Sequence, residues 1–285
     1  MRRNVLRLAV VASSAAVTVS CSTDQLGGVS SPTDLRLARE DDIKARRVKA
    51  AKIGHFHNRL LEFVKDDVTG RSRARKYSFS EEMALAAASC TRFMKSEGVN
   101  YTCVFSRERK NISTQIVLGP SIARPRSDLS EAAIDYLAQI EVAAAAATGA
   151  SGFATASSAI AAAAEGELYG DDLDAVLGAV ALGDSSFTYW ETRGNTFVTS
   201  YVNNRGLEEP YTMMVDPISG HRIAATVILA RPTLIRYGWF QWKSVANWDI
   251  SGCVVATIFT GGGCALGGGA ASAGEAIYQI LQHYT

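Results

Sequence analysis

The chain of 285 residues contains 29 Lys and Arg against 28 Asp and Glu, so its formal net charge is +1. If residues 1–20 are removed as a signal peptide, three arginines leave with them and the net charge becomes −2. A nearly neutral chain gives no electrostatic reason to expect nucleic acid as a partner. Its 47% of hydrophobic residues is enough to bury a sizeable core.

The first twenty residues have the pattern of a secretory signal. Arg2, Arg3 and Arg7 form a basic head, and Leu8–Val19 is an apolar run too short to span a bilayer. We therefore treat residues 1–20 as a signal peptide that does not belong to the fold.

Cys21 directly follows this run. Val19, Ser20 and Cys21 resemble the lipobox of bacterial lipoproteins, although Thr18 stands where Leu or Val is usual. The resemblance implies cleavage before Cys21 and acylation of its sulfur, so that membrane lipid is a partner and the protein is anchored in the bacterial cell envelope. The absence of Asp after the cysteine favours the outer membrane of a double-membraned bacterium. Ordinary secretion with an unmodified cysteine is the alternative.

Residues 21–36 are rich in Ser, Gly and Thr without apolar periodicity, so we expect a flexible tether. From 37 to 185 apolar residues recur at helical spacing, most clearly at Ile53, Phe56 and Leu60. The spacing predicts helices over 37–65, 80–95, 128–147 and 155–165 and a further helix from Asp171. Because alanine favours helices and lets them approach closely, this part should be an alanine-rich helical bundle.

The pattern changes from Phe187 onward. The runs FTYWE, TFVTSYV, YTMMV and RIAATVIL are rich in β-branched and aromatic residues, and turn-forming residues separate them. We predict an antiparallel β-meander within a β region of 186–248. A Gly/Cys-rich apolar segment at 249–285, with a strand and a closing helix, should follow. The fold class expected for the chain is α+β.

Four cysteines besides Cys21 are disulfide candidates. Cys90 falls in a predicted helix and Cys103 in a predicted strand that returns along it, so these two can reach each other. Cys253 and Cys264 would lie about 16 Å apart along a continuous helix, which is too far for a bond. Either the chain bends sharply between them or they pair elsewhere, so the pairing stays open.

Sequence patterns typical of catalysis are missing. We find no G-x-S-x-G, C-x-x-C, H-E-x-x-H, P-loop or dinucleotide-binding glycine pattern. His55 and His57 lie about 200° apart around a helix, so they cannot share one ion. We therefore expect no catalytic residues, no metal site and no cofactor, and an enzyme is the less favoured interpretation.

The run from Ile250 to Gly274 has no charged residue and contains eight glycines. Trp239, Trp242 and Trp248 precede it, and aromatic residues in such positions are typical of membrane interfaces. Gly263 and Gly267 have the spacing that lets membrane helices pack closely. A second membrane contact through 249–285 is therefore an alternative to burial in the core of an ordinary domain.

Two resemblances concern this segment. Residues 249–253, Asp-Ile-Ser-Gly-Cys, together with Cys264 resemble the mature peptide of microhalocin-type and related bacteriocin precursors. This resemblance implies that the N-terminal part is removed and the C-terminal peptide attacks membranes. The small residues resemble those of glycine-zipper envelope lipoproteins, which implies insertion or self-association.

The function favoured by the sequence is a lipid-anchored cell-envelope protein with a non-enzymatic binding or structural role. The sequence does not identify a protein partner. The bacteriocin-like precursor and the membrane-inserting glycine-zipper lipoprotein are the two alternatives.

Overall fold

The computed structural model describes residues 32–70, 78–99, 101–103, 117–118, 129–207, 213–215, 222–224, 238–260 and 264–284. The chain divides into two compact units, Met1–Asp41 and Asp42–Thr285. Of the first unit only the opening of a helix is described, and the predicted signal peptide and Cys21 lie outside the described residues. The end of the predicted tether, residues 32–36, is helical.

Seven helices form the described body of the chain: α1 (Pro32–Thr69), α2 (Phe79–Ser96), α3 (Glu131–Ala146), α4 (Ala150–Glu167), α5 (Gly170–Arg205), α6 (Trp242–Thr260) and α7 (Cys264–Tyr284). Local sequence signals set several of their ends. Ser78 begins α2 with a capping box, in which its side chain accepts from the backbone N–H of Glu81 and the Glu81 carboxylate accepts in return. Gly206, with φ at +63°, ends α5 in the left-handed conformation that favours glycine.

The expected α+β fold was wrong, because the described part of the chain is all-α. Residues 170–205 form one helix, so FTYWE and TFVTSYV are helical. Among the described residues after 186, a short pair of strands within YTMMV and RIAATVIL stands in place of the expected β-meander. The run VVATIF, expected as a strand, lies in α6. The described strands form two short antiparallel pairs, β1 (Tyr101–Thr102) with β2 (Val117–Leu118) and β3 (Met213–Val215) with β4 (Arg222–Ala224).

Helix α5 continues through the aromatic runs because its buried residues repeat with a helical period. The fully or almost fully buried side chains Phe187, Trp190, Phe197 and Tyr201 are three, seven and four residues apart, so they lie on one face. Aromatic and β-branched residues have a small intrinsic preference for strands. The free energy gained by burying these rings on one helix face is larger, so the helix continues.

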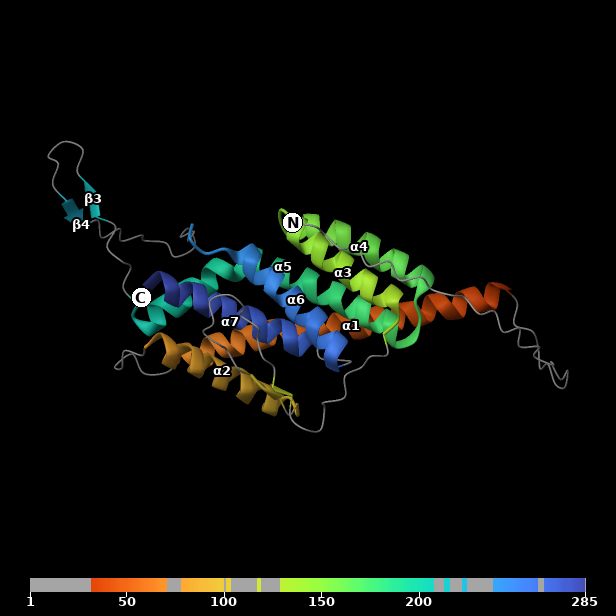
Figure 1. Cartoon of the computed structure of the whole chain (residues 1–285), viewed down its shortest axis with the longest axis horizontal. Coiled ribbons are helices and arrows are strands. Elements are labelled where there is room, and N and C mark those ends of the chain that lie inside the picture. The colour runs from red at the N-terminus through yellow and green to blue at the C-terminus, as the bar shows by residue number, and fades with distance from the viewer. Residues whose placement is uncertain are drawn as a thin grey trace, which may run out of the picture. The chain divides into compact units, whose positions relative to one another are not determined.

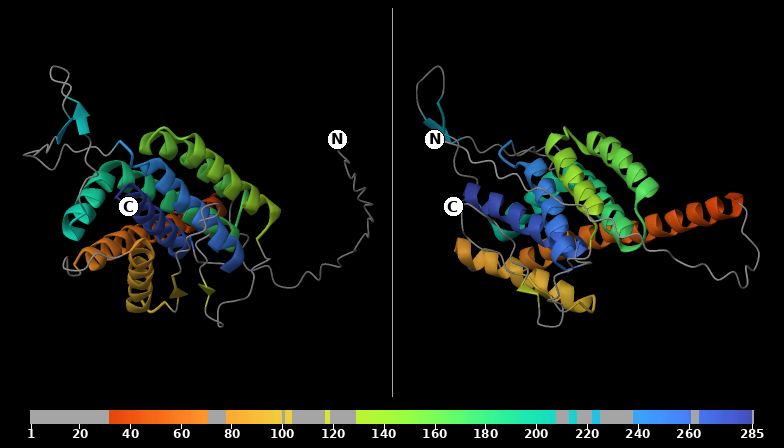
Figure 2. Two further views of the ribbon diagram at one scale, coloured as in Figure 1. Left: turned by 60° about the vertical axis from the view of Figure 1, so that its left-hand side comes forward. Right: turned by 45° about the vertical axis from the view of Figure 1, so that its right-hand side comes forward.

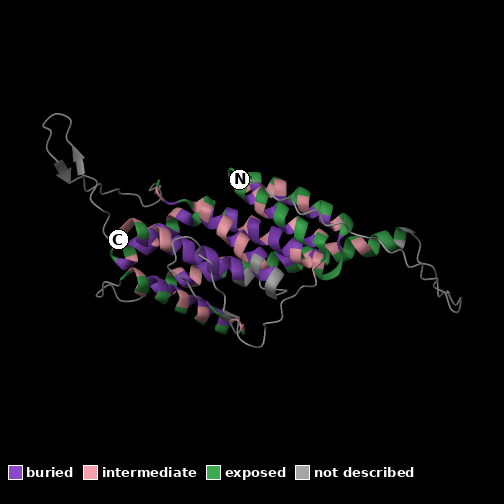
Figure 3. Ribbon diagram, viewed as in Figure 1, coloured by how far each residue is buried: buried purple, intermediate pink, exposed green. Residues whose placement is uncertain are grey.

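Helices α6 and α7 form a hairpin in the middle of the bundle, drawn in blue in Figure 1. Helix α6 packs against α3 and α5, and α7 packs against α2 and α5. In both views of Figure 2 the pair lies between α2 on one side and α3 and α4 on the other. Every residue from Gly267 to Ile277 is buried, as the purple of α7 in Figure 3 shows. Most of the described residues of the uncharged segment therefore lie in the core.

Three consecutive glycines, 267–269, let α7 approach three different helices. Successive residues point about 100° apart around a helix, so these glycines face three directions. At the first, a Cβ would clash with the backbone of Gly252 in α6. At the second it would lie 2.8 Å from Leu182 of α5, and at the third 2.7 Å from Leu60 of α1. The glycines are explained by close packing within the protein.

We expect Gly267→Ala to lower the free energy of unfolding by about 1–3 kcal/mol, because the added methyl must push the α6 backbone away. Gly166 of α4 is the matched control, since a Cβ there would meet nothing within 4 Å. Gly166→Ala should instead stabilise the protein, by about 0.4–1 kcal/mol. Denaturant unfolding of both variants measures the difference. A Gly267→Ala protein as stable as Gly166→Ala would contradict the close approach of α6 and α7.

The four cysteines selected as disulfide candidates form two disulfides. Cys90 of α2 is bonded to Cys103, just after β1, with their Cα atoms 5.9 Å apart. Cys253 of α6 is bonded to Cys264 of α7. The chain turns back between these two helices, so the sharp bend is the alternative that the structure adopts.

Candidate functional site

Asp249 of α6 collects polar side chains from two other helices deep in the bundle. Its Oδ1 lies 2.9 Å from Nε2 of His57 in α1. Its Oδ2 accepts hydrogen bonds from the hydroxyl of Ser186 and, at 3.2 Å, from the indole N–H of Trp190, both in α5. His57, Ser186 and Asp249 are 0% exposed. One carboxylate therefore ties α1, α5 and α6 together.

The contact of His57 with Asp249 is that of an ion pair. Burial by itself would lower the pKa of His57, but the Asp249 carboxylate and the contact of Nδ1 with Asn58 outweigh burial and raise this pKa above its ordinary value. His57 Nε2 and Asp249 Oδ1 lie within ion-pair distance, but their geometry does not meet the criteria for a hydrogen bond. Charge attraction between these two buried side chains thus holds α1 to α6.

The cluster contains Ser, His and Asp, but it is not arranged for nucleophilic catalysis. In a catalytic triad the histidine contacts the serine and takes its proton. Here Ser186 donates to Asp249 instead, and His57 contacts the other oxygen of the same carboxylate. Because all three side chains are enclosed, a substrate has no access to them. We interpret the cluster as a structural centre.

A second buried cluster joins the start of α2 to the end of α5. Glu82 Oε1 accepts from Nε of Arg205 at 3.1 Å and from a second guanidinium nitrogen, while Oε2 accepts from the Tyr201 hydroxyl at 2.9 Å. The Arg205 and Glu82 side chains are 2% and 4% exposed. Burial and the neighbouring carboxylate raise the pKa of Tyr201 well above its ordinary value. This cluster, too, is closed to ligands.

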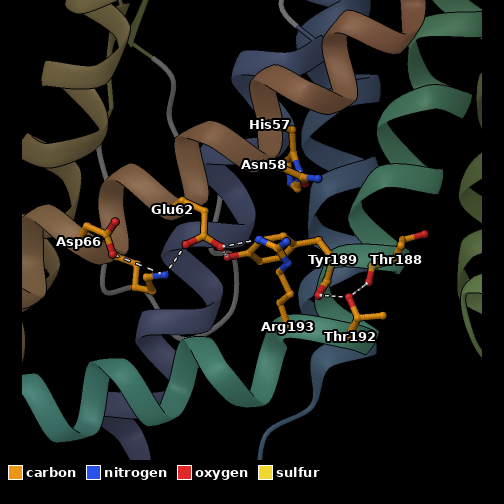
Figure 4. A network of polar contacts seen from close by, with 9 residues as sticks. His57, Asn58, Glu62, Asp66, Thr188, Tyr189, Thr192 and Arg193 are labelled. Atoms are coloured by element: carbon orange, nitrogen blue, oxygen red, sulfur yellow. Dashed lines mark hydrogen bonds and ion pairs between the residues drawn. The ribbon is translucent and has the colours of Figure 1, made fainter.

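A third network lies nearer to the surface (Figure 4). Glu62 of α1 accepts from the Tyr189 hydroxyl at 2.9 Å, pairs with Lys65 and lies 3.6 Å from Arg193, and Figure 4 shows it pointing toward α5. Burial favours a higher pKa for Glu62, but the hydrogen bonds from Lys65 and Tyr189 and the two cations lower it overall. The network borders an open groove of about 490 Å³. The Glu62 carboxylate is already paired with Lys65 and Arg193 inside the protein. We therefore assign this network a role in helix packing rather than in ligand binding.

The structure places the predicted interface tryptophans partly inside the bundle. Trp239, Trp242 and Trp248 are all half-buried. Trp239 stacks on His283 with ring centroids 4.2 Å apart, and Trp242 meets Phe187 edge to face. Packing accounts for the first two without a membrane.

The predicted pair of close-packing glycines is only partly described. Gly267 lies against Gly252, which the sequence analysis did not select, and Gly263 lies outside the described residues. Cys21, the predicted acylation site, is likewise outside them.

Sequence reasoning missed the buried polar clusters. Asp249 carried one usable signal, since it is the single acid directly before a long uncharged run. Glu82 and Arg205 look like ordinary surface residues, because 123 residues separate them along the chain.

Within the described ranges, no three His, Cys, Asp or Glu side chains gather in a way that could hold a metal ion. None of the helices in these ranges combines the length and the apolar content needed to cross a bilayer. The chain matches no family model, no curated protein and no solved structure.

Proposed function

We propose that this chain is a lipid-anchored protein of the bacterial cell envelope with a non-enzymatic binding or structural role. Acylation of Cys21 would hold it to membrane lipid. The basic head at Arg2, Arg3 and Arg7, the apolar run Leu8–Val19 and the lipobox-like residues before Cys21 support the anchor.

The two disulfides support a place outside the cytoplasm. Cys90–Cys103 and Cys253–Cys264 are both intramolecular, so they use all four cysteines other than Cys21. Disulfides of this kind persist in oxidising compartments and are rare where thiols are kept reduced. A signal for export and two disulfides point to the same compartment.

The central position of α6 and α7 favours this proposal over release of 249–285 as a peptide or its insertion in a membrane. Helices α2, α3 and α5 pack against the hairpin, and Leu60 of α1 lies against Gly269. Releasing 249–285 as a peptide would expose these apolar faces to water. We therefore assign the segment a structural role in the bundle.

Mass spectrometry and fractionation of the natively expressed full chain test the anchor. We expect a mature chain that starts at Cys21, carries acyl chains and stays in the membrane fraction. A Cys21→Ser variant should be recovered from the soluble fraction with the same helical content by circular dichroism. A native chain that keeps residues 1–20 and carries no acyl group would refute the proposal.

A membrane-active C-terminal hairpin is the second candidate. The observation that favours it is the chemistry of the segment itself, which is uncharged from 250 to 274 and closed by the Cys253–Cys264 disulfide. The same mass spectra decide between the two, because this candidate requires a released C-terminal fragment and our proposal requires an intact chain.

A further inference from the structure

A pocket of about 310 Å³ lies between the residues that precede α6 and the last turns of α7, toward the label C in Figure 1. Three aromatic side chains, Trp239, Tyr278 and His283, line it together with Glu275 and three glutamines. Its volume is within the range of about 300–1,000 Å³ that is typical of small-molecule sites. The described residues that line it include one acid and no lysine or arginine.

The carboxylate of Glu275 is largely buried and has no counter-charge among the described residues. Glu275 is 7% exposed, and its Oε1 accepts a hydrogen bond from Nε2 of Gln279 at 2.8 Å. Its other oxygen makes no hydrogen bond within the described part of the chain, but it is not sealed from solvent. Burial raises the pKa of Glu275, and no cation opposes this effect. Since a carboxylate can accept about four hydrogen bonds, most of this capacity is available to a ligand in the pocket.

Contacts with neighbouring residues hold the side chains of the pocket in place. Gln279 accepts from the backbone N–H of Gln241 at 2.8 Å through its side-chain oxygen, while its side-chain nitrogen donates to Glu275. The ring of Tyr278 meets Phe79 of α2 edge to face, with centroids 5.5 Å apart. A ligand would therefore find the carboxylate and this ring already positioned, which lowers the entropy cost of binding.

The chemistry of the pocket favours a cation that carries N–H donors. A protonated amine would donate to the second oxygen of Glu275 and would supply the positive charge that the carboxylate lacks. Trp and Tyr rings attract a cation within about 6 Å and also pack against an apolar group. The negative end of the α7 dipole, at the last turn that contains His283, favours the same sign. An anion would be repelled by the acid, and a quaternary ammonium has no N–H to donate.

We infer that this pocket binds a protonated amine that carries an apolar group, with the ammonium at Glu275 and the apolar group against Trp239 and Tyr278. This inference gives a ligand class to the binding role proposed above and rests on that role. It does not depend on acylation at Cys21, so the two can fail separately.

Equilibrium dialysis of the full chain against 2-phenylethylamine, 2-phenylethanol and 3-phenylpropanoate tests the inference. The three probes share an apolar body and are cationic, neutral and anionic at pH 8, where an ordinary histidine is neutral. We expect one saturable amine site per chain, binding of the alcohol weaker by about tenfold, and no binding of the anion.

Two variants of the pocket locate the site. Glu275→Gln keeps the shape of the side chain and an acceptor for Gln279 but removes the charge. It should weaken amine binding about tenfold and leave binding of the alcohol unchanged. Trp239→Leu should weaken binding of both the amine and the alcohol, because it removes a ring that packs against their shared body.

Matched substitutions outside the pocket are the controls. Glu141→Gln removes a half-buried acid of α3, and Trp248→Leu removes a half-buried indole of α6. Both should bind the probes like the unaltered chain, and circular dichroism verifies that all four variants are folded. No saturable amine binding, equal binding of the alcohol, or unchanged amine binding in either pocket variant would overturn the inference. Each of these results would leave the mass of the mature chain, and hence the anchor, unaffected.

Discussion

Replacing Arg205 by Met is expected to lower the free energy of unfolding by about 3–5 kcal/mol, as is typical when one partner of a buried ion pair is removed. Glu82 would keep its charge in a site where its side chain is 4% exposed, with only the Tyr201 hydroxyl left among the contacts described above. Because the pair joins the start of α2 to the end of α5, its loss should also loosen α2. Denaturant unfolding followed by circular dichroism measures the effect.

Two further variants show whether burial causes this loss. Arg193 also pairs with a glutamate, Glu62, but its side chain is 66% exposed and the N–O distance is 3.6 Å. Arg193→Met should therefore cost no more than about 1 kcal/mol. Adding Glu82→Gln to Arg205→Met should recover a large part of the lost stability, since no unpaired charge then remains. Equal losses for the two arginine variants would refute the buried pair.

The helices of the first half could be predicted because their signals are local. Apolar residues at helical spacing indicated a helix over 37–65, and the structure has α1 there, from Pro32 to Thr69. The second helix was expected to begin at residue 80, but its N-cap is Ser78. A capping box needs a glutamate three residues after the cap, and Glu81 stands at that distance from Ser78. Periodicity and caps act within a few residues, so the sequence contains them.

The second half could not be predicted because its preferences come from distant contacts. Phe187, Trp190 and Tyr201 favour strands when taken alone, but burial of their shared face selects a helix. The glycines of α7 would weaken an isolated helix by about 1 kcal/mol each. They are retained because α1, α5 and α6 come within contact distance, which only the folded bundle reveals.

The buried clusters escaped prediction for the same reason. His57 is buried in α1, but Asp249 follows 192 residues later. The distance along the sequence between His57 and Asp249 does not indicate that α1 and α6 will pack together. Conversely, the tryptophans and glycines selected as membrane features are chemically suited to a protein core as well, so composition alone could not separate the two environments.

Asp249→Asn is expected to lower the free energy of unfolding by about 3 kcal/mol near pH 6, because His57 loses the counter-charge that compensates its burial. Asn keeps the volume of the side chain and one oxygen that can accept from Ser186 and Trp190. The loss should therefore come mainly from the missing charge. Unfolding in urea at pH 6 compares the variant with the unaltered chain.

The direction in which stability changes with pH distinguishes the loss of an ion pair from a packing defect. Folding raises the pKa of His57, so the stabilisation is fully present below its ordinary value of about 6.5 and is lost as pH rises through the higher folded value. In Asp249→Asn burial dominates and should lower this pKa, so stability should fall as pH drops below about 6.5 instead. Asp184→Asn, which neutralises a partly buried acid bonded to Ser157, should keep the original dependence above pH 6.5. The same pH profile in Asp249→Asn as in the unaltered chain would mean that His57 and Asp249 do not form an ion pair.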